Sequence, residues 1–459
     1  MPKEGNMIIR SFLKNRPGKV KLLDDSIGTS AASRRAFLQT MAARGVLIPA
    51  TCALWSTESD AGETHVDAAA TANTAKARGK RSTGAVRVVR DFSDPYLELI
   101  RLLHEASEVE HSLMLQYLYG AFSLKPAYRA VAGYGAPSAT DLIGVAIQEM
   151  QHLGAVNRML VALGAAPHLI REDFPYEPEI YPFPFNLEPL SLKSLAKYVY
   201  CEAPVGATDP GKAKTQDDAA FQERLFKSLG LDQRPNHVGS LYNAIIAQVN
   251  EVRTASTPSL PDLKPWVEKL TQIKEQGEHD HYEFFKRVFM GTHDGFNGHP
   301  DVWALSPQHS DYPAIPLIAN PSAYVGHTNQ IQDPVAFGLA WLGNLHYWTV
   351  LFLLDAGFRS GSSTYILMAR VHMLGPVWAL ARHMPQYGVG LPFDPLCSGY
   401  APGTTQVATL RITERMLVEA DGLTQKLKAH LPSDYPVTIA RESIAQLKTE
   451  IDKKDGRNA

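Results

Sequence analysis

Two Glu-x-x-His motifs lie inside apolar stretches whose residue spacing is typical of α-helices. Glu149 and His152 continue the apolar face of the first stretch, and Glu278 and His281 lie on the apolar face of the second, at residues 265–289. Carboxylates and imidazoles that point into a protein core need partners, because an unpaired buried charge is costly. The two motifs therefore constrain the fold more than any other feature of the chain.

Each motif is preceded along the chain by another helical stretch that carries one inward glutamate. Glu110 lies on the apolar face of residues 95–122, and Glu202 extends the apolar stripe of residues 191–203. Glu105 falls off the apolar face of its stretch, as does Glu108, so both are expected to be solvated. Four successive core helices thus carry Glu, Glu-x-x-His, Glu and Glu-x-x-His, which is the ligand set of a carboxylate-bridged dinuclear metal site in a four-helix bundle.

Mixed oxygen and imidazole donors suit iron or manganese, and the lack of thiolates makes zinc a weaker choice. We therefore predict two iron or manganese ions. The alternative is a buried network of ion pairs and hydrogen bonds without metal. The predicted ligands are Glu110, Glu149, His152, Glu202, Glu278 and His281.

Two further residues are candidates for this site. Glu275 lies one turn before Glu278. It is either an alternative ligand or a residue that contacts the ligands without binding the metal itself. Tyr117 lies two turns from Glu110 on the same face, within reach of the site as a redox or hydrogen-bonding group; the competing interpretation is an ordinary core tyrosine.

The rest of the chain extends this bundle. Residues 165–190, rich in proline and aromatic side chains, predict a long crossover, and the helical stretch at residues 236–253 lies in an insertion that we interpret as a lid over one end of the bundle. Residues 291–335 predict irregular structure. Residues 338–358 are nearly apolar but contain Asn344, His346 and Asp355, which favours a buried helix over a membrane span. Two more helical stretches follow, so the expected fold is all-α.

The amino-terminal region has the features of an export signal. Residues 33–39 read SRRAFLQ, and a short apolar run and small residues follow, which is typical of a twin-arginine signal. This predicts a periplasmic or secreted protein and a contact with the twin-arginine export machinery. Residues 57–90 predict a disordered linker. The expected divisions are a signal and linker at 1–90, a metal-binding bundle at 91–290, and an irregular segment with a helical extension at 291–459.

The net charge of the chain limits the kinds of binding partner to expect. The 459 residues carry a formal net charge of -2, which gives no electrostatic reason to expect nucleic acid or an acidic membrane surface as a partner. A small-molecule substrate is therefore the expected partner, and no stable membrane insertion is expected. Cys201 and Cys397 either pair or stay free, and the oligomeric state stays open.

Several segments together resemble a known family. They are EVEHSLMLQYLYGAFSLK, IQEMQHLGAVNRMLVALGAAP, LAKYVYCEAP, VGSLYNAI and EQGEHDHYEFF. Between residues 92 and 290 the chain resembles the ferritin-like domain of the iminophenyl-pyruvate dimer synthase family, found in violacein and indolocarbazole pathways. The six predicted ligands stand at that family's metal-ligand positions.

The resemblance implies an all-α fold with a ferritin-like four-helix bundle, a long crossover and a carboxy-terminal helical extension. Members of the family couple two imines derived from aromatic 2-oxo acids. An export signal does not suit a cytoplasmic pigment pathway, and the pigment enzymes carry large additional regions, so we carry over the fold and the site but not the substrate. The expectation is an exported oxidoreductase that acts with oxygen or peroxide on a small aromatic or imine-type molecule. The alternative is a non-catalytic metal-binding or structural protein.

Overall fold

The computed structural model describes residues 88–456 with several gaps. The described residues fall into one compact unit. The SRRAFLQ motif lies outside them, and so does the predicted linker apart from residues 88–90. The described part is all-α, as expected: it contains no strand, only two isolated β-bridges. The gaps are residues 135–136, 177–180, 205, 209–214, 231–237, 255–259, 297, 300 and 397–401.

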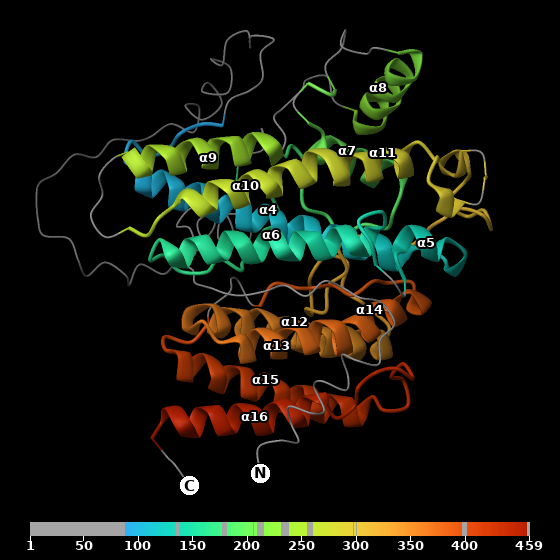
Figure 1. The fold of residues 1–459 in the computed structure, drawn as a ribbon. Coiled ribbons are helices and arrows are strands. Elements are labelled where there is room, and N and C mark those ends of the chain that lie inside the picture. The colour runs from blue at the N-terminus through green and yellow to red at the C-terminus, as the bar shows by residue number, and fades with distance from the viewer. Residues whose placement is uncertain are drawn as a thin grey trace, which may run out of the picture. The chain divides into compact units, whose positions relative to one another are not determined.

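The amino-terminal half is a helical bundle (Figure 1). Helix α4 packs on α6, while α7 packs on α11 and carries α8 (Gln216–Leu229) on its other side. Helix α9 packs along α4 and α10, so it is a member of the bundle and not the lid that its place in an insertion suggested. The bundle elements are α4 (Pro95–Ser123), α6 (Leu142–Ala162), α7 (Leu192–Glu202), α9 (Val238–Thr254), α10 (Lys264–Gln276), a π-helical turn (Gly277–His281) and α11 (Tyr282–Phe289).

Side-chain caps fix where these helices begin. Asp94 accepts a hydrogen bond from the backbone N–H of Leu97 and starts α4, and Ser191 forms a capping box with Ser194 at the start of α7. The cap of α6 is Asp141, whose side chain accepts a hydrogen bond from the backbone N–H of Gly144. The helix starts are therefore encoded locally, to within a few residues.

Helix α4 is buried on all sides, which corrects one expectation. Glu105 and Glu108 are only 3% and 6% exposed, not solvated. The face of α4 that carries Glu108 lies against the crossover, where the Nε2 of His168 is 2.6 Å from a Glu108 oxygen. Burial raises the pKa of Glu108 to about 8. The spacing of apolar residues reveals one buried face of a helix, but it does not reveal that other segments cover the opposite face.

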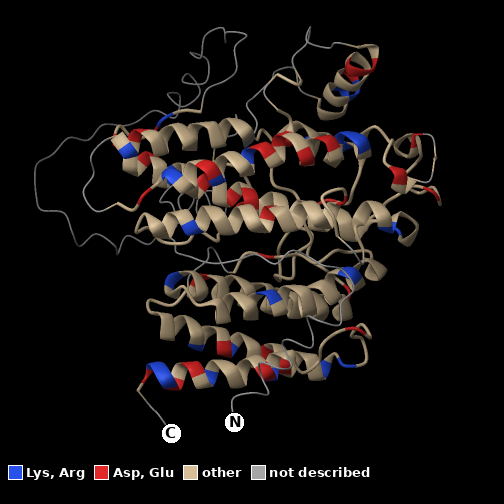
Figure 2. Ribbon diagram, in the orientation of Figure 1, with Lys and Arg blue, Asp and Glu red and all other residues tan. Residues whose placement is uncertain are grey.

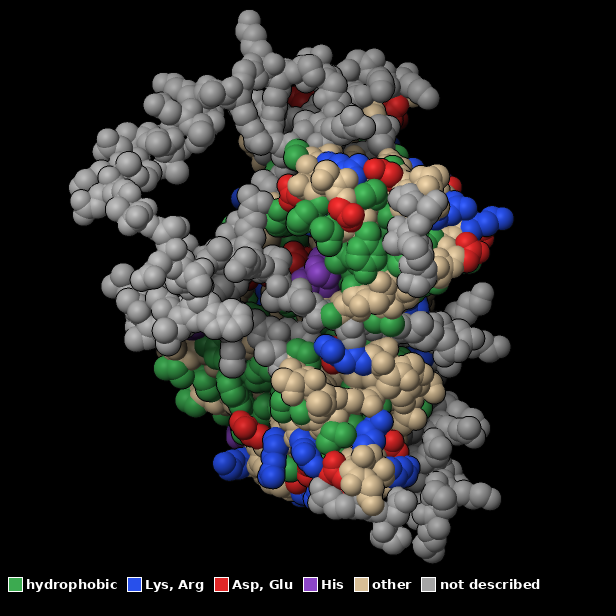
Figure 3. Space-filling model, turned by 90° about the vertical axis from the view of Figure 1, so that its left-hand side faces the viewer, with side chains coloured by type: hydrophobic (Ala, Val, Ile, Leu, Met, Phe, Trp, Pro, Cys, Tyr) green, Lys and Arg blue, Asp and Glu red, His purple; other side chains and the backbone are tan. Residues whose placement is uncertain are grey.

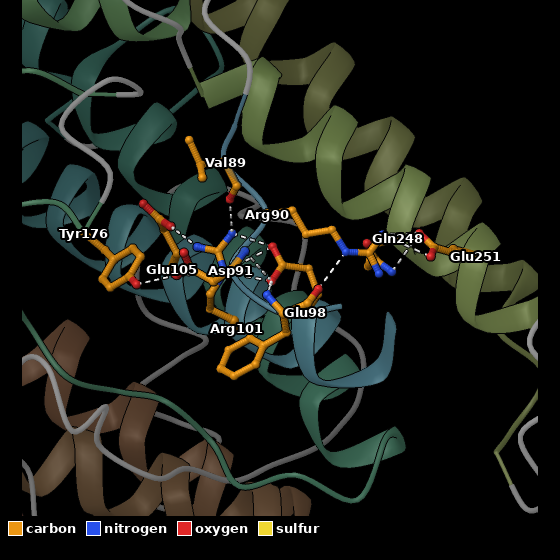
Figure 4. Close-up of polar contacts among 10 residues, drawn as sticks. Val89, Arg90, Asp91, Glu98, Arg101, Glu105, Tyr176, Gln248 and Glu251 are labelled. Carbon is orange, nitrogen blue, oxygen red and sulfur yellow. Dashed lines mark hydrogen bonds and ion pairs between the residues drawn. The ribbon is translucent and has the colours of Figure 1, made fainter. Parts of the chain in front are cut away.

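Arg101 holds together the amino-terminal end of α4 (Figure 4). Its guanidinium lies 2.7 Å from a Glu98 oxygen and 3.2 Å from a Glu105 oxygen, and both carboxylates are almost fully buried. It also lies over the ring of Tyr176, whose hydroxyl donates to Asp91. One buried cation thus neutralises two buried carboxylates and joins three segments of the chain.

The carboxy-terminal half adds a second set of helices (Figure 1). Helix α12 packs against α13 and α15, and α15 packs against α16. Among the described residues α12 is the helix long and apolar enough to cross a membrane, and 78% of the apolar window is buried inside the protein. The elements are α12 (Pro334–Ser360), α13 (Ser363–His372), a second π-helical turn (Met373–Val377), α14 (Trp378–His383), α15 (Gln406–Lys426) and α16 (Ile439–Lys454).

Charged side chains are unevenly distributed over these helices. Figure 2 shows few along α12 and many of both signs along α16. The face seen in Figure 3 mixes apolar and charged side chains, with its densest charged group at the carboxy-terminal helices. Both signs are interspersed there, in keeping with a net charge near zero.

Two buried histidines join the carboxy-terminal helices. The Nδ1 atoms of His346 and His372 are 2.9 Å apart, and their Nε2 atoms contact the hydroxyls of Tyr435 and Ser443. Both rings are fully buried, which lowers the pKa of His372 to about 3 and that of His346 well below its ordinary value. These residues are therefore neutral core histidines.

The buried neutral state of His372 predicts acid sensitivity. An unfolded chain takes up a proton at this histidine near pH 6.5 and the folded chain does not, so the free energy of unfolding falls as the pH drops below about 6.5. Between pH 7 and pH 5 this residue alone should account for a loss of about 2 kcal/mol. The free energy of unfolding, measured in urea at pH 7 and pH 5, should therefore fall by that amount less in His372→Gln than in the wild type. An equal fall in both proteins would show that His372 is not neutral in the folded state.

Candidate metal centre

The six predicted ligands all line one cavity inside the bundle. The cavity has a volume of about 20 Å³, which is space for a water molecule or a metal ion. Its polar walls come from α4, α6, α7, α9 and the π-helical turn, and Leu113 and Ile273 contribute apolar surface. Groups that are up to 171 residues apart in the sequence, Glu110 and His281, therefore meet at one place.

Glu149 stands between the two imidazoles. One of its oxygens is 2.7 Å from Nδ1 of His152, and the other is 3.1 Å from Nδ1 of His281. Two groups of buried side chains share this carboxylate, and within each group the candidate donor atoms lie within 4.8 Å of one another. The groups are Glu110, Glu149 and His152, and Glu149, Glu202 and His281.

A glutamine fixes the orientation of each imidazole. The Nε2 of His152 lies 2.9 Å from the side-chain oxygen of Gln276, and the Nε2 of His281 lies 2.9 Å from that of Gln148. An amide oxygen only accepts hydrogen bonds, so Nε2 carries the proton and Nδ1 faces the cavity as a donor atom for a cation. Gln148 directly precedes Glu149, but nothing in its spacing distinguished it from a surface glutamine.

Two buried atoms at the cavity have no hydrogen-bond partner within the described part of the chain. They are Nδ1 of His281 and Oε1 of Glu278. Nδ1 of His281 lies 3.1 Å from an oxygen of Glu149 and 3.6 Å from an oxygen of Glu202, but neither contact has hydrogen-bond geometry. A buried imidazole nitrogen and a buried carboxylate oxygen that line one cavity without hydrogen-bond partners fit a cation ligand set better than a closed hydrogen-bond network. The residues present therefore fit a metal centre.

The charges of the cluster depend on one another. Burial acts to lower the pKa of His281, but Glu149 and Glu202 raise it to about 10. Burial acts to raise the pKa of Glu149, but His281 and His152 lower it below its ordinary value. Burial, with help from Glu149, raises the pKa of Glu110 to about 8. Without a metal the carboxylates are thus balanced by protons on the imidazoles, and a divalent cation would displace those protons.

Glu278 lines the cavity but stays outside both groups. Its carboxylate is 3.5 Å from Nζ of Lys274, and 17% of its side chain is exposed. The sequence predicted one continuous helix here, whereas the structure has a π-helical turn from Gly277 to His281. This turn winds more slowly than an α-helix, so Glu278 and His281 no longer share a face as Glu149 and His152 do. The alternative ligand Glu275 is exposed.

Two tyrosine hydroxyls reach the cluster. Tyr117 donates to Oε1 of Glu202 at 2.5 Å, which places this candidate at the site. Tyr242 of α9 donates to Oε1 of Glu110, and the sequence reasoning missed it. A signal was present, because Tyr242 shares a helical phase with Ile245 and Val249, but the interpretation of this helix as a lid placed it away from the bundle core.

Cys201 also lines the cavity and is buried. Its pairing with Cys397 stays an open alternative, since Cys397 lies outside the described residues.

Gly277 leaves the space that Glu202 needs. A Cβ at this position would stand 2.9 Å from Oε2 of Glu202. Gly277→Ala is therefore expected to move this carboxylate and to weaken metal binding about tenfold. Gly154→Ala is the control, because its Cβ would meet only the end of the Arg158 side chain, at 3.7 Å. Metal titration of both variants is the measurement, and equal affinities would show that Glu202 needs no such space.

Comparison with known proteins supports the same fold. Residues 103–279 match the family model described as Ferritin-like. The chain is similar to a protein named dichlorochromopyrrolate synthase from Lentzea aerocolonigenes, with 26% identity over 322 residues that cover 57% of this chain and 31% of that protein. The chain thus spans under a third of the length of this relative, and no solved structure gives a significant match. The helical bundle and the family match together identify residues 103–279 as a ferritin-like domain.

Proposed function

We propose that this protein is a metal-dependent oxidoreductase with two iron or manganese ions in the bundle cavity. The observation that carries the proposal is the position of Glu149, with one oxygen toward each imidazole, as a carboxylate bridge requires. Glu110 and His152 would hold one ion, and Glu202 and His281 would hold the other. Glu278, which lies outside both groups and is paired with Lys274 at the cavity wall, would be a further ligand.

A bound metal pair would supply the activation of oxygen or peroxide, or the polarisation of an organic substrate. The chain's own residues prepare the place for that chemistry. Gln148 and Gln276 hold the imidazoles in one tautomer, and Leu113 and Ile273 give the cavity apolar surface. Tyr117 holds a proton at its hydroxyl, because burial and the neighbouring Glu202 raise its pKa well above the ordinary value.

We propose a small aromatic or imine-type molecule as the substrate. This choice rests on the similarity to a protein named dichlorochromopyrrolate synthase, of which the matched region is only a part. The oxidative chemistry rests on the ligand set itself.

Elemental analysis of purified protein tests the proposal. We expect about two iron or manganese ions per chain, and a change in the optical spectrum when peroxide is added to the iron-loaded protein. Metal without any reaction toward oxygen or peroxide would favour a non-catalytic metal-binding protein. No metal after loading with either ion would leave only the interpretation as a buried polar network.

We also propose export through the twin-arginine route, on the strength of the SRRAFLQ motif. Replacing Arg34 and Arg35 together by lysine should leave the protein in the cytoplasm. Fractionation of cells that express both forms is the test, and equal export of the two would overturn the proposal.

A further inference from the structure

We infer that Tyr242 is a positioning residue of the metal centre, which ties up one oxygen of Glu110 so that only the other oxygen is offered to a metal ion. The inference rests on the proposed metal centre and assigns α9 a role in it. Tyr117 donates to the other outer carboxylate at Oε1 of Glu202, which is also the oxygen 3.6 Å from Nδ1 of His281, so it holds that carboxylate without dividing its two oxygens.

The contacts of Glu110 carry the first step. Tyr242 is 1% exposed and Glu110 is 2% exposed, so neither group is open to bulk water. The tyrosine hydroxyl donates to Oε1 of Glu110, while Oε2 faces the cavity at 3.5 Å from Nδ1 of His152. The hydrogen bond thus divides the two oxygens between two tasks, one for α9 and one for the metal position.

The second step is the contrast with Glu149. Within the described chain a tyrosine hydroxyl donates to each outer carboxylate, and none donates to the central one. Glu149 therefore keeps both oxygens for the two metal positions. The hydrogen bond from Tyr242 would restrict Glu110 to binding through one oxygen, and Glu149 would be left to bridge.

The third step separates Tyr242 from ordinary buried tyrosines. Tyr119, Tyr128 and Tyr134 satisfy their hydroxyls with backbone carbonyl oxygens. Any of these bonds would serve a tyrosine whose only role is packing. The hydroxyl of Tyr242 instead goes to a carboxylate of the cavity, and α9 also contributes Gly239 to the cavity wall. Helix α9 therefore acts on the centre directly.

The test is Mn²⁺ titration by calorimetry, with Tyr242→Phe compared with Tyr198→Phe. Tyr198 is an equally buried tyrosine near Tyr117 whose hydroxyl goes to a backbone oxygen, so its loss should leave metal binding unchanged. Loss of a group that orients a ligand weakens metal binding about 10- to 100-fold. We expect this loss at one of the two positions in Tyr242→Phe, and at the other in Tyr117→Phe.

Repeating the substitution in a Glu110→Gln protein separates an effect through Glu110 from general damage to the fold. If Tyr242 acts through Glu110, then Tyr242→Phe should change Mn²⁺ affinity less than about twofold in a Glu110→Gln protein. Circular dichroism of every variant reports on folding apart from metal binding.

The outcomes separate the two proposals. If the wild-type protein binds Mn²⁺ and Tyr242→Phe matches Tyr198→Phe, the role of Tyr242 is refuted and the metal centre stands. An equal further loss in the Glu110→Gln background also refutes that role. If the folded wild-type protein binds neither manganese nor iron, the proposed function and this inference fall together.

Discussion

Glu149→Gln should abolish metal binding at both positions, which reduces the metal content from about two ions per chain to almost none. Glu149 is the one side chain that the two ligand groups share, so its loss removes a donor from each of them. A neutral amide is also a weak ligand, and it no longer offsets the charge of a cation in a buried cavity. Elemental analysis after loading and dialysis is the measurement.

Glu108→Gln is the matched control. Glu108 is a buried glutamate of the same bundle that lies outside the cavity, and burial already favours its neutral form by raising the pKa to about 8. This variant should load metal as the wild type does. Two ions in Glu149→Gln would rule out a carboxylate bridge at this residue and with it the proposed centre.

Arg101→Met should lower the free energy of unfolding by about 3–5 kcal/mol, the range for breaking a buried ion pair by removing one partner. The substitution leaves the carboxylates of Glu98 and Glu105 buried without their cation (Figure 4). Equilibrium unfolding in urea, followed by helical circular dichroism, measures the loss.

Arg90→Met is the comparison, because the ion pair of Arg90 with Glu251 is about 40% exposed on both sides. Water screens an exposed ion pair, so this variant should lose little stability. In the Arg101→Met protein, converting both Glu98 and Glu105 to glutamine should restore most of the loss. If the two arginine variants lose equal stability, burial is not what makes the Arg101 cluster important.

The sequence located most of the bundle because its signals are local. Apolar spacing marked the four helical stretches, and Asp94, Ser191 and Pro204 marked their ends. The two Glu-x-x-His motifs and the two inward glutamates pointed to one cavity, which all six side chains do line. Their role as metal ligands stays a prediction that the metal analysis above tests.

Other features could not be predicted from the sequence, because they depend on how distant segments pack against one another. The burial of Glu105 and Glu108 requires a second layer over α4, which no periodicity reveals. The position of Glu278 outside both ligand groups depends on a π-helical turn, which the apolar spacing does not distinguish from the α-helices on either side. The interpretation of α9 as a lid was wrong because an insertion between two helices carries no mark of where it packs.

The sequence by itself determined which residues are helical and which polar groups must face the core, because helix periodicity and the cost of burying charge act over a few residues at a time. Only the tertiary structure decided which of those groups lie within contact distance. The packing of helices that are far apart in the chain places Glu149 between His152 and His281. The same packing brings the hydroxyl of Tyr242 within hydrogen-bond distance of Glu110. Distances between helices depend on the whole core, and short-range spacing does not contain them.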